Sequence, residues 1–248
     1  MTMMNESQVA SAIAPIVGSL GAEYMLDSET AAVGRAAGYE SSFDFYFAGR
    51  GGVLGDVDAD VIYAAFMFFD HALVEKLWNR GIKVEGARAA GKRYLQCCDS
   101  WGRKHLANIP DLEKFIAPAA KLVAGVDASG LSLFAGVRAE PLPTDAPALA
   151  YRLIDSLREL RGCYHIAALV TYGLTGLQAT ISSKGDDGTA KMHGWPPPYP
   201  DCSSLVAQRI AAEEATNTAM ARAIAACLST TEMNTLATEI TRINKSIS

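Results

Sequence analysis

The chain has 248 residues, half of them hydrophobic and a fifth charged, which is enough to fill a sizeable core and excludes general disorder. Its 22 Lys and Arg stand against 27 Asp and Glu, for a net charge of -5, so it lacks the positive charge of a non-specific nucleic-acid binder. The start, MTMMNESQVA, does not resemble a signal peptide, and the longest strongly apolar run, 61–69, is too short to span a membrane. We therefore expect a cytoplasmic protein with no membrane contact.

Helical patterns dominate the first half of the chain. A short helix is expected from Ser28 to the closing Gly38. The next begins near Asp56 or Asp58 and runs to Gly81, and its apolar residues on nearly every side predict a central buried helix. Two more helices are expected over 84–106 and 110–124.

Glycines and prolines interrupt residues 128–145, where we expect a linker with one short helix over Leu131–Arg138. A helical pattern then runs from Ala146 to about Ile181, with a break near Gly162. Residues 183–202 are rich in Gly and Pro and predict a long loop, which is typical of a lid or a binding loop. Two helices close the chain, over about 203–228 and from about Thr230 onward.

The absence of any alternating strand pattern predicts an all-α fold. We expect a bundle of eight to ten helices around a buried central helix, without a significant sheet. An N-terminal helical half, 1–127, and a C-terminal half, 146–248, are expected to pack as one compact unit. The five cysteines form no C-x-x-C pair, so free thiols are expected rather than a metal site.

One arginine lies among four glycines in the segment Tyr46–Gly55, YFAGRGGVLG. Glycines let a backbone approach a ligand closely, and an arginine there can hold a carboxylate, sulfate or phosphate by two hydrogen bonds. We therefore expect Tyr46 and Arg50 to bind a substrate. The alternative is a tight turn between helices in which Arg50 caps backbone carbonyls.

Arg158, Arg161 and His165 follow one another at spacings of three and four, so they share one strip of a helix. They repel one another unless something anionic lies among them, and Glu159, about 100° away around the helix, is a poor partner for all three. We expect Arg158 to bind substrate, and Arg161 and His165 to be catalytic, with His165 as general acid or base. The alternative is a solvated basic face beside a hydrogen-bonded core histidine.

Polar residues interrupt the apolar stripe of the long C-terminal helix, which consists of Val206, Ile210, Met220 and Ile224. Glu213 and Asn217 fall on this stripe, and Thr216 adjoins them. Burying such groups without partners costs on the order of a few kcal/mol, so they face either a pocket or a structural network. In the pocket interpretation Glu213 is catalytic, Thr216 and Asn217 bind substrate, and Arg50, Arg161, His165 and Glu213 converge on one cavity.

Four motifs in order make the chain similar to an actinobacterial family that is often described as helix-turn-helix. The family pattern Y-F-A-G-R-x-x-P-L-G corresponds to Tyr46–Gly55, with Val53 in place of proline. L-R-E-x-R-G-D-G-H corresponds to Leu157–His165, with Cys-Tyr in place of Asp-Gly. G-L-S-G-L corresponds to 173–177, and E-x-x-T-D corresponds to 213–217 with Asn217 in place of aspartate.

This resemblance covers roughly residues 10–182 and 205–245, and it departs from the family between the third and fourth motifs. Relatives carry a winged-helix-like segment there, whereas this chain has the Gly/Pro-rich residues 183–202. Because the segment associated with DNA binding is missing, we expect a small-molecule pocket and no nucleic-acid partner.

Proteins similar to this family occur in natural-product gene clusters, including clusters for aziridine-containing azabicycles. The resemblance thus implies an enzyme or enzyme subunit of secondary metabolism, in which an amine closes a ring by displacing a sulfate or phosphate. Arg50, Arg158 and Arg161 would hold the leaving oxyanion, while His165 or Glu213 takes the amine proton. No Rossmann or P-loop signature is present, so we expect no cofactor, an anionic small-molecule substrate, and assembly with a second copy or a related subunit.

Two other functions stay open at this point. The description of the relatives implies a ligand-responsive helix-turn-helix transcription regulator, which would bind DNA in a salt-dependent manner. A non-catalytic ligand-binding or partner subunit would instead show ligand-dependent melting without turnover.

Overall fold

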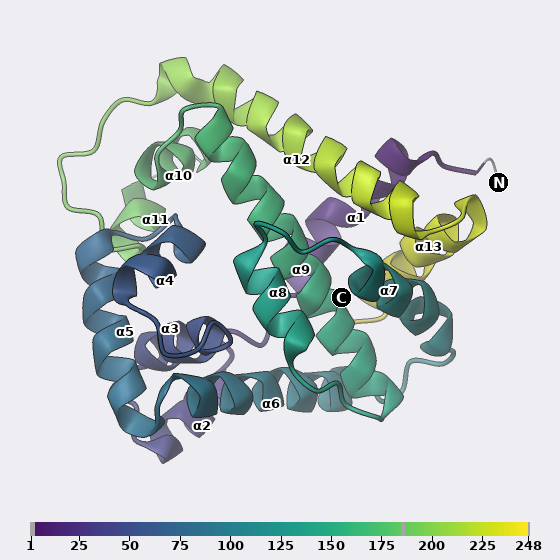
Figure 1. Cartoon of the computed structure of the whole chain (residues 1–248), viewed down its shortest axis with the longest axis horizontal. Helices are drawn as coiled ribbons and strands as arrows, with labels where there is room; N and C mark the ends of the chain where they lie inside the picture. The colour runs from purple at the N-terminus through teal and green to yellow at the C-terminus, as the bar shows by residue number, and fades with distance from the viewer. Residues whose placement is uncertain (1–2, 185–186, 248) are drawn as a thin grey trace.

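The computed structural model describes residues 3–184 and 187–247, which form thirteen α-helices, one short 3-10 helix and no strand (Figure 1). The all-α fold is therefore confirmed, although the helices outnumber the eight to ten expected. In chain order they are α1 (Glu6–Leu20), α2 (Ser28–Ala37), α3 (Ser42–Gly52), α4 (Ala59–Phe66), α5 (His71–Glu85), α6 (Ala87–Leu106), α7 (Glu113–Gly125), α8 (Ser132–Ala139), α9 (Ala146–Thr171), α10 (Gly176–Lys184), α11 (Asp187–Met192), α12 (Val206–Cys227) and α13 (Thr230–Ile247), with the 3-10 helix at Ser203–Leu205.

The central helix is α9, which passes through the middle of the molecule and packs against α1, α6, α7, α8 and α12 (Figure 1). Our prediction had placed the central helix at 56–81, and that was wrong. This stretch holds two helices, α4 and α5, separated by the connection Met67–Asp70. A new helix begins after Asp70 because this residue is the N-cap of α5. Its backbone is extended, and its carboxylate accepts hydrogen bonds from the amides of Ala72 and Leu73.

The predicted break at Gly162 is absent, because α9 continues unbroken to Thr171. The helix ends instead in a four-residue turn, Tyr172–Thr175, where Gly173 takes a left-handed φ of 72° that costs other residues strain. Thr175 and Gln178 then cap the start of α10, because the backbone amide of each is bonded to the other's side chain.

Residues 46–52 form the body of α3 rather than a turn. Their glycines serve helix packing. A side chain at Gly52 would collide with the carbonyl oxygen of Ala87 in α6, and one at Gly49 would collide with the ring of Tyr94. The bare backbone of α3 therefore lies directly on α6, and the expectation of a glycine-rich turn around Arg50 is corrected.

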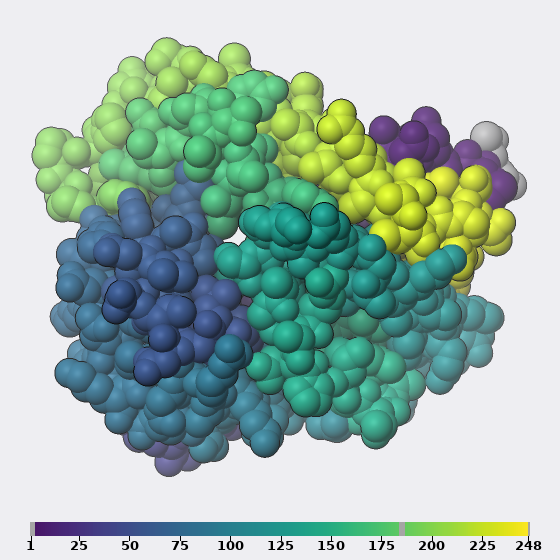
Figure 2. All heavy atoms as spheres, viewed as in Figure 1, coloured from purple at the N-terminus to yellow at the C-terminus, as the bar shows by residue number. Residues whose placement is uncertain are grey.

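The two ends of the chain pack together. α1, which the sequence patterns did not predict, lies against α12 and α13, and its first residues appear beside α13 in the space-filling view (Figure 2). Two hydrogen bonds join the backbone of Met4 to the side chain of Asn234, at 2.8 and 2.9 Å. No helix in the described part of the chain is long and apolar enough to cross a membrane.

The Gly/Pro-rich stretch 183–202 is not a continuous loop, because α11 lies inside it. Ala190 of α11 is fully buried and forms a small apolar cluster with Ile181 and Cys202. Burial of this one helical turn therefore anchors the middle of the stretch to α10.

Candidate functional site

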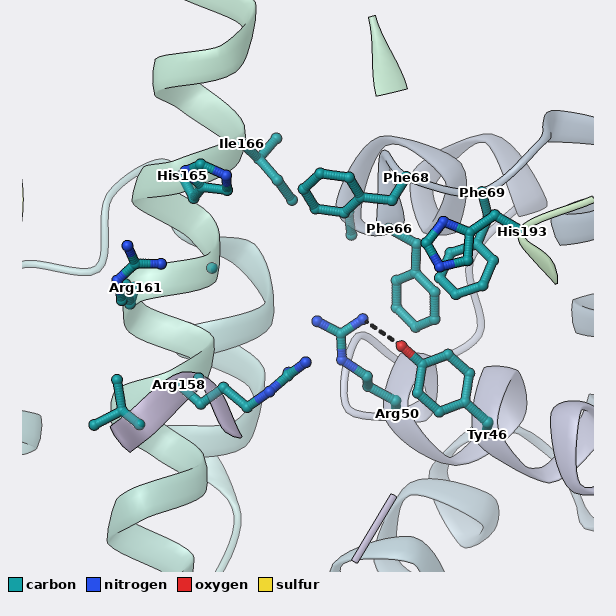
Figure 3. Close-up of a pocket in the computed structure, with 14 residues that line it drawn as sticks. Tyr46, Arg50, Phe66, Phe68, Phe69, Arg158, Arg161, His165, Ile166 and His193 are labelled. Atoms are coloured by element: carbon teal, nitrogen blue, oxygen red, sulfur yellow. Dashed lines mark hydrogen bonds between the residues drawn. The ribbon is translucent and has the colours of Figure 1, made fainter. Parts of the chain in front are cut away.

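A cavity of about 280 Å³ lies between α9 and the part of the chain formed by α3 and residues 65–69. Figure 3 shows Arg158, Arg161 and His165 on α9 on one side, and Tyr46, Arg50 and three phenylalanines on the other. The remaining lining residues are Val17, Gly18, Ala65, Gly162, Ile166 and His193. A second hollow of about 480 Å³ shares Tyr46, Phe69, Arg158 and His193 with the first.

Aromatic rings form most of one wall. Phe66, Phe68 and Phe69 come from the end of α4 and the connection that follows it. The guanidinium carbon of Arg50 lies 4.5 Å from the ring centre of Phe66, which is a cation–π distance. This wall offers flat apolar surface, with few polar groups that can fix the orientation of a ligand.

The charge of Arg50 is neutralised from within the protein. Glu159, only 1% exposed, accepts from Nε and Nη2 of Arg50 at 2.9 and 2.8 Å, and from Nη1 of Arg158 at 2.9 Å. Our expectation that Glu159 is a poor partner was therefore wrong for Arg158, because the flexible Arg158 side chain folds back onto it. It holds for Arg161 and His165, whose partners come from α12. Burial raises the pKa of Glu159, but Arg50 and Arg158 outweigh burial and hold the pKa below its usual range.

A second buried carboxyl, that of Asp155, lies one helical turn before Glu159. Asp155 is also only 1% exposed. The hydroxyl of Tyr24 lies 3.5 Å from its Oδ1, and Oδ2 has no hydrogen-bond partner. Burial, followed by the nearby Glu159 charge, raises the pKa of Asp155 to about 7. The two carboxyls therefore differ in charge state, with Glu159 ionised and Asp155 partly protonated at neutral pH.

Arg161 has a carboxylate partner from another helix. It forms an ion pair with Glu213 of α12, which also accepts from Nη1 of Arg209 at 3.3 Å. This pairing holds α9 against α12 behind the cavity. Glu213 is 39% exposed at its side chain, so water screens this pair more than the one at Glu159.

His165 is 7% exposed and lies between the cavity and α12. Its Nδ1 is 2.9 Å from Oγ1 of Thr216, whose hydroxyl donates to the carbonyl of Ala212 at 2.7 Å. Because that hydroxyl proton is already used, Nδ1 carries the imidazole proton and Nε2 is an open acceptor. Burial, followed by the Arg209 charge, lowers the pKa of His165 to about 4, so the ring is neutral at pH 7.

The structure brings five of the eight expected site residues to the cavity lining: Tyr46, Arg50, Arg158, Arg161 and His165. Glu213 and Thr216 lie behind the lining and contact it through Arg161 and His165. Asn217 is not among the lining residues, and its Oδ1 is buried without a hydrogen-bond partner. The adjacent Asp70 and His71 act separately, as a helix cap and as a partner of Asp60 at 2.6 Å.

Sequence reasoning missed the residues that make the site possible, namely Asp155, Glu159 and the phenylalanine wall. A signal for the wall was present, because three phenylalanines within four residues interrupt the helix periodicity just before a capping aspartate, at 66–70. No local signal marks Glu159 as buried, because its partner Arg50 lies 109 residues earlier in the chain.

A family model described as a helix-turn-helix family matches residues 10–248. The match spans nearly the whole chain, and the chain belongs to this helix-turn-helix family. Comparisons with curated proteins and with solved structures give no match.

This membership corrects the expected partners. Helix-turn-helix proteins as a class place a helix in a DNA groove, so the expectation of no nucleic-acid partner is overturned. The expected anionic small-molecule substrate is also not supported, because Glu159 and Glu213 already pair with the arginines that were to hold it.

Proposed function

We propose that this member of the helix-turn-helix family is a DNA-binding regulator that responds to a small molecule held in the cavity beside α9. One observation carries the proposal. Helix α9 supplies the polar wall of the cavity and then leads directly into the turn Tyr172–Thr175 and into α10. A four-residue turn with a left-handed glycine between two helices is the local form of a helix-turn-helix.

The composition of the cavity indicates the kind of small molecule. Its walls are mainly aromatic and aliphatic, which suits a flat conjugated ring. Nε2 of His165 is an open acceptor for a hydrogen-bond donor on that ring. The ligand class is therefore a planar molecule that carries a hydrogen-bond donor.

DNA binding is tested by gel shift with DNA from upstream of the protein's own gene. Ser183 is exposed on α10, so Ser183→Glu places a negative charge where DNA would lie and should weaken binding by about fivefold or more. Ser11→Glu, on an exposed site of α1, is the matched control. Because the net charge is -5, we expect few contacts to DNA phosphates. The logarithm of the DNA-binding constant should therefore fall with the logarithm of the salt concentration with a slope shallower than about -3. No shift with any upstream fragment would refute DNA binding.

A second candidate is cofactor-independent proton-transfer chemistry on the bound small molecule, of the kind that the resemblance to natural-product proteins implies. The observation that favours it is the open Nε2 of His165 in the cavity. A pKa of about 4 makes this nitrogen a weak base at neutral pH, since a general base works best with a pKa near the working pH. Turnover of a cavity ligand that His165→Ala abolishes, while binding stays intact, would favour this candidate over the regulator.

A further inference from the structure

We infer that occupancy of the cavity is transmitted to α10 through the connection Met67–Asp70. This short segment is part of the cavity wall on one side and the support of the α10–α11 region on the other. Its consequence for DNA rests on the proposed function, but the coupling itself does not.

On the cavity side, the connection contributes Phe68 and Phe69 to the lining. The ring of Phe68 lies nearly parallel to the imidazole of His165, with centres 6.2 Å apart. The ring of Phe69 lies 4.5 Å, centre to centre, from His193, which follows α11 and lines the same cavity. A ligand in the cavity therefore touches the connection and the end of α11 together (Figure 3).

On the other side, the backbone of the connection holds residues of the α10–α11 region. Nε1 of Trp195 donates to the carbonyl of Phe68 at 2.9 Å, and the amide of Asp70 donates to the carbonyl of His193 at 2.9 Å. Gly176, the first residue of α10, lies so close to the carbonyl of Met67 that any side chain there would collide with it. The start of α10 and the residues after α11 thus contact the backbone of this short segment at three of its four residues, Met67, Phe68 and Asp70.

These contacts couple the two sides thermodynamically. If the α10–α11 region moves away, it takes His193 out of the cavity and frees the backbone of Phe68, so the binding site is dismantled. A ligand that binds only the assembled site lowers the population of the open state by the factor 1 + [L]/Kd. By reciprocity, whatever holds α10 in place also tightens ligand binding.

Filling the cavity by mutation tests this coupling without a known ligand. Gly18 lines the cavity, and a Cβ built there has no atom within 4 Å, so Gly18→Leu and Gly18→Phe extend into open space. Gly18→Ala is the matched control for the gain in helix propensity, and Ala12→Leu, exposed on the same helix, controls for added apolar surface. The readout is amide hydrogen exchange in α10, with α7, which has no residue in the lining, as the internal reference.

Relative to Gly18→Ala, we expect exchange in α10 to slow by about threefold to fivefold in Gly18→Leu or Gly18→Phe, with no change in α7. In the unmodified protein, indole serves as a flat neutral probe, and at ten times its Kd it should slow α10 exchange by up to about elevenfold. Trp195→Phe keeps an aromatic side chain but removes the Nε1–H that donates to the carbonyl of Phe68. In the double variant Gly18→Leu with Trp195→Phe, most of the slowing of α10 exchange caused by Gly18→Leu should be lost.

Unchanged α10 exchange in the filled variants would overturn the inference, as would additive effects of Gly18→Leu and Trp195→Phe, because independent sites add. Exchange does not involve DNA, so a failed gel shift refutes only the proposed function. If DNA binding and coupling both hold, Gly18→Leu should also change the affinity for DNA relative to Gly18→Ala, and Ala12→Leu should not.

Discussion

Removal of the buried charge of Glu159 should cost far more stability than the same change at Glu213. Glu159 is 1% exposed and accepts three charge-assisted hydrogen bonds, at 2.8 to 2.9 Å, from Arg50 and Arg158. In Glu159→Gln two guanidinium groups stay largely buried without a compensating charge. Breaking a buried pair in this way costs about 3–5 kcal/mol of unfolding free energy.

Glu213→Gln provides the matched comparison. Glu213 also serves two arginines, Arg161 and Arg209, but its side chain is 39% exposed. Water replaces much of the lost interaction, so the expected cost is about 1 kcal/mol or less. Both substitutions keep the shape of the side chain, so their difference isolates the effect of burial.

Urea unfolding at pH 7.5, followed by far-UV circular dichroism, measures both values. A cost below about 1 kcal/mol for Glu159→Gln, or equal costs for the two variants, would refute the argument from burial. The double variant Arg50→Leu with Glu159→Leu should recover part of the loss, because only the Arg158 guanidinium then remains without its carboxylate partner. If the double variant is less stable than Glu159→Gln, the Arg50–Glu159 pair stabilises the fold by packing and hydrogen bonds as well as by charge neutralisation.

Three further predictions concern pH and backbone packing. Asp155→Asn should raise the unfolding free energy at pH 8 by on the order of a few kcal/mol and change it little at pH 4. The reason is that the pKa of Asp155 is raised from 3.8 to about 7, so the native state loses stability as pH rises from 3.8 to 7. Urea unfolding at pH 4 and pH 8 measures the two effects, and an equal effect at both pH values would contradict the prediction. His165 has a pKa lowered from 6.5 to about 4, so it should stay neutral at pH 5.5, and stability should fall as pH drops from about 6.5 to 4; an imidazole NMR titration with a midpoint above 6 would exclude this. Gly176→Ala forces a methyl group against the carbonyl of Met67 and should cost about 1–3 kcal/mol, seen as a lower urea midpoint, whereas a midpoint equal to that of the unmodified protein would show that the two backbones are not in contact.

Local patterns were enough to predict six of the thirteen helices in the described part of the chain. Capping residues and a period near 3.6 predicted α2, α6, α7, α8, α12 and α13 within a few residues of their observed ends, because these signals act within one or two turns of the chain. The patterns failed where packing decides the conformation. Gly49 and Gly52 suggest a turn by composition, yet both are helical, and the absence of side chains at these two positions lets α3 lie directly on α6.

The candidate site divides in the same way between local and distant information. The spacing of Arg158, Arg161 and His165 places them on one side of a helix, and this followed from the sequence alone. The sequence did not show that Glu159 is buried between Arg50 and Arg158, or that Met67–Asp70 supports α10 while its phenylalanines line the cavity. Those features join residues about a hundred positions apart. The energy of a buried charge depends on which distant groups surround it, and only the packed tertiary structure decides that.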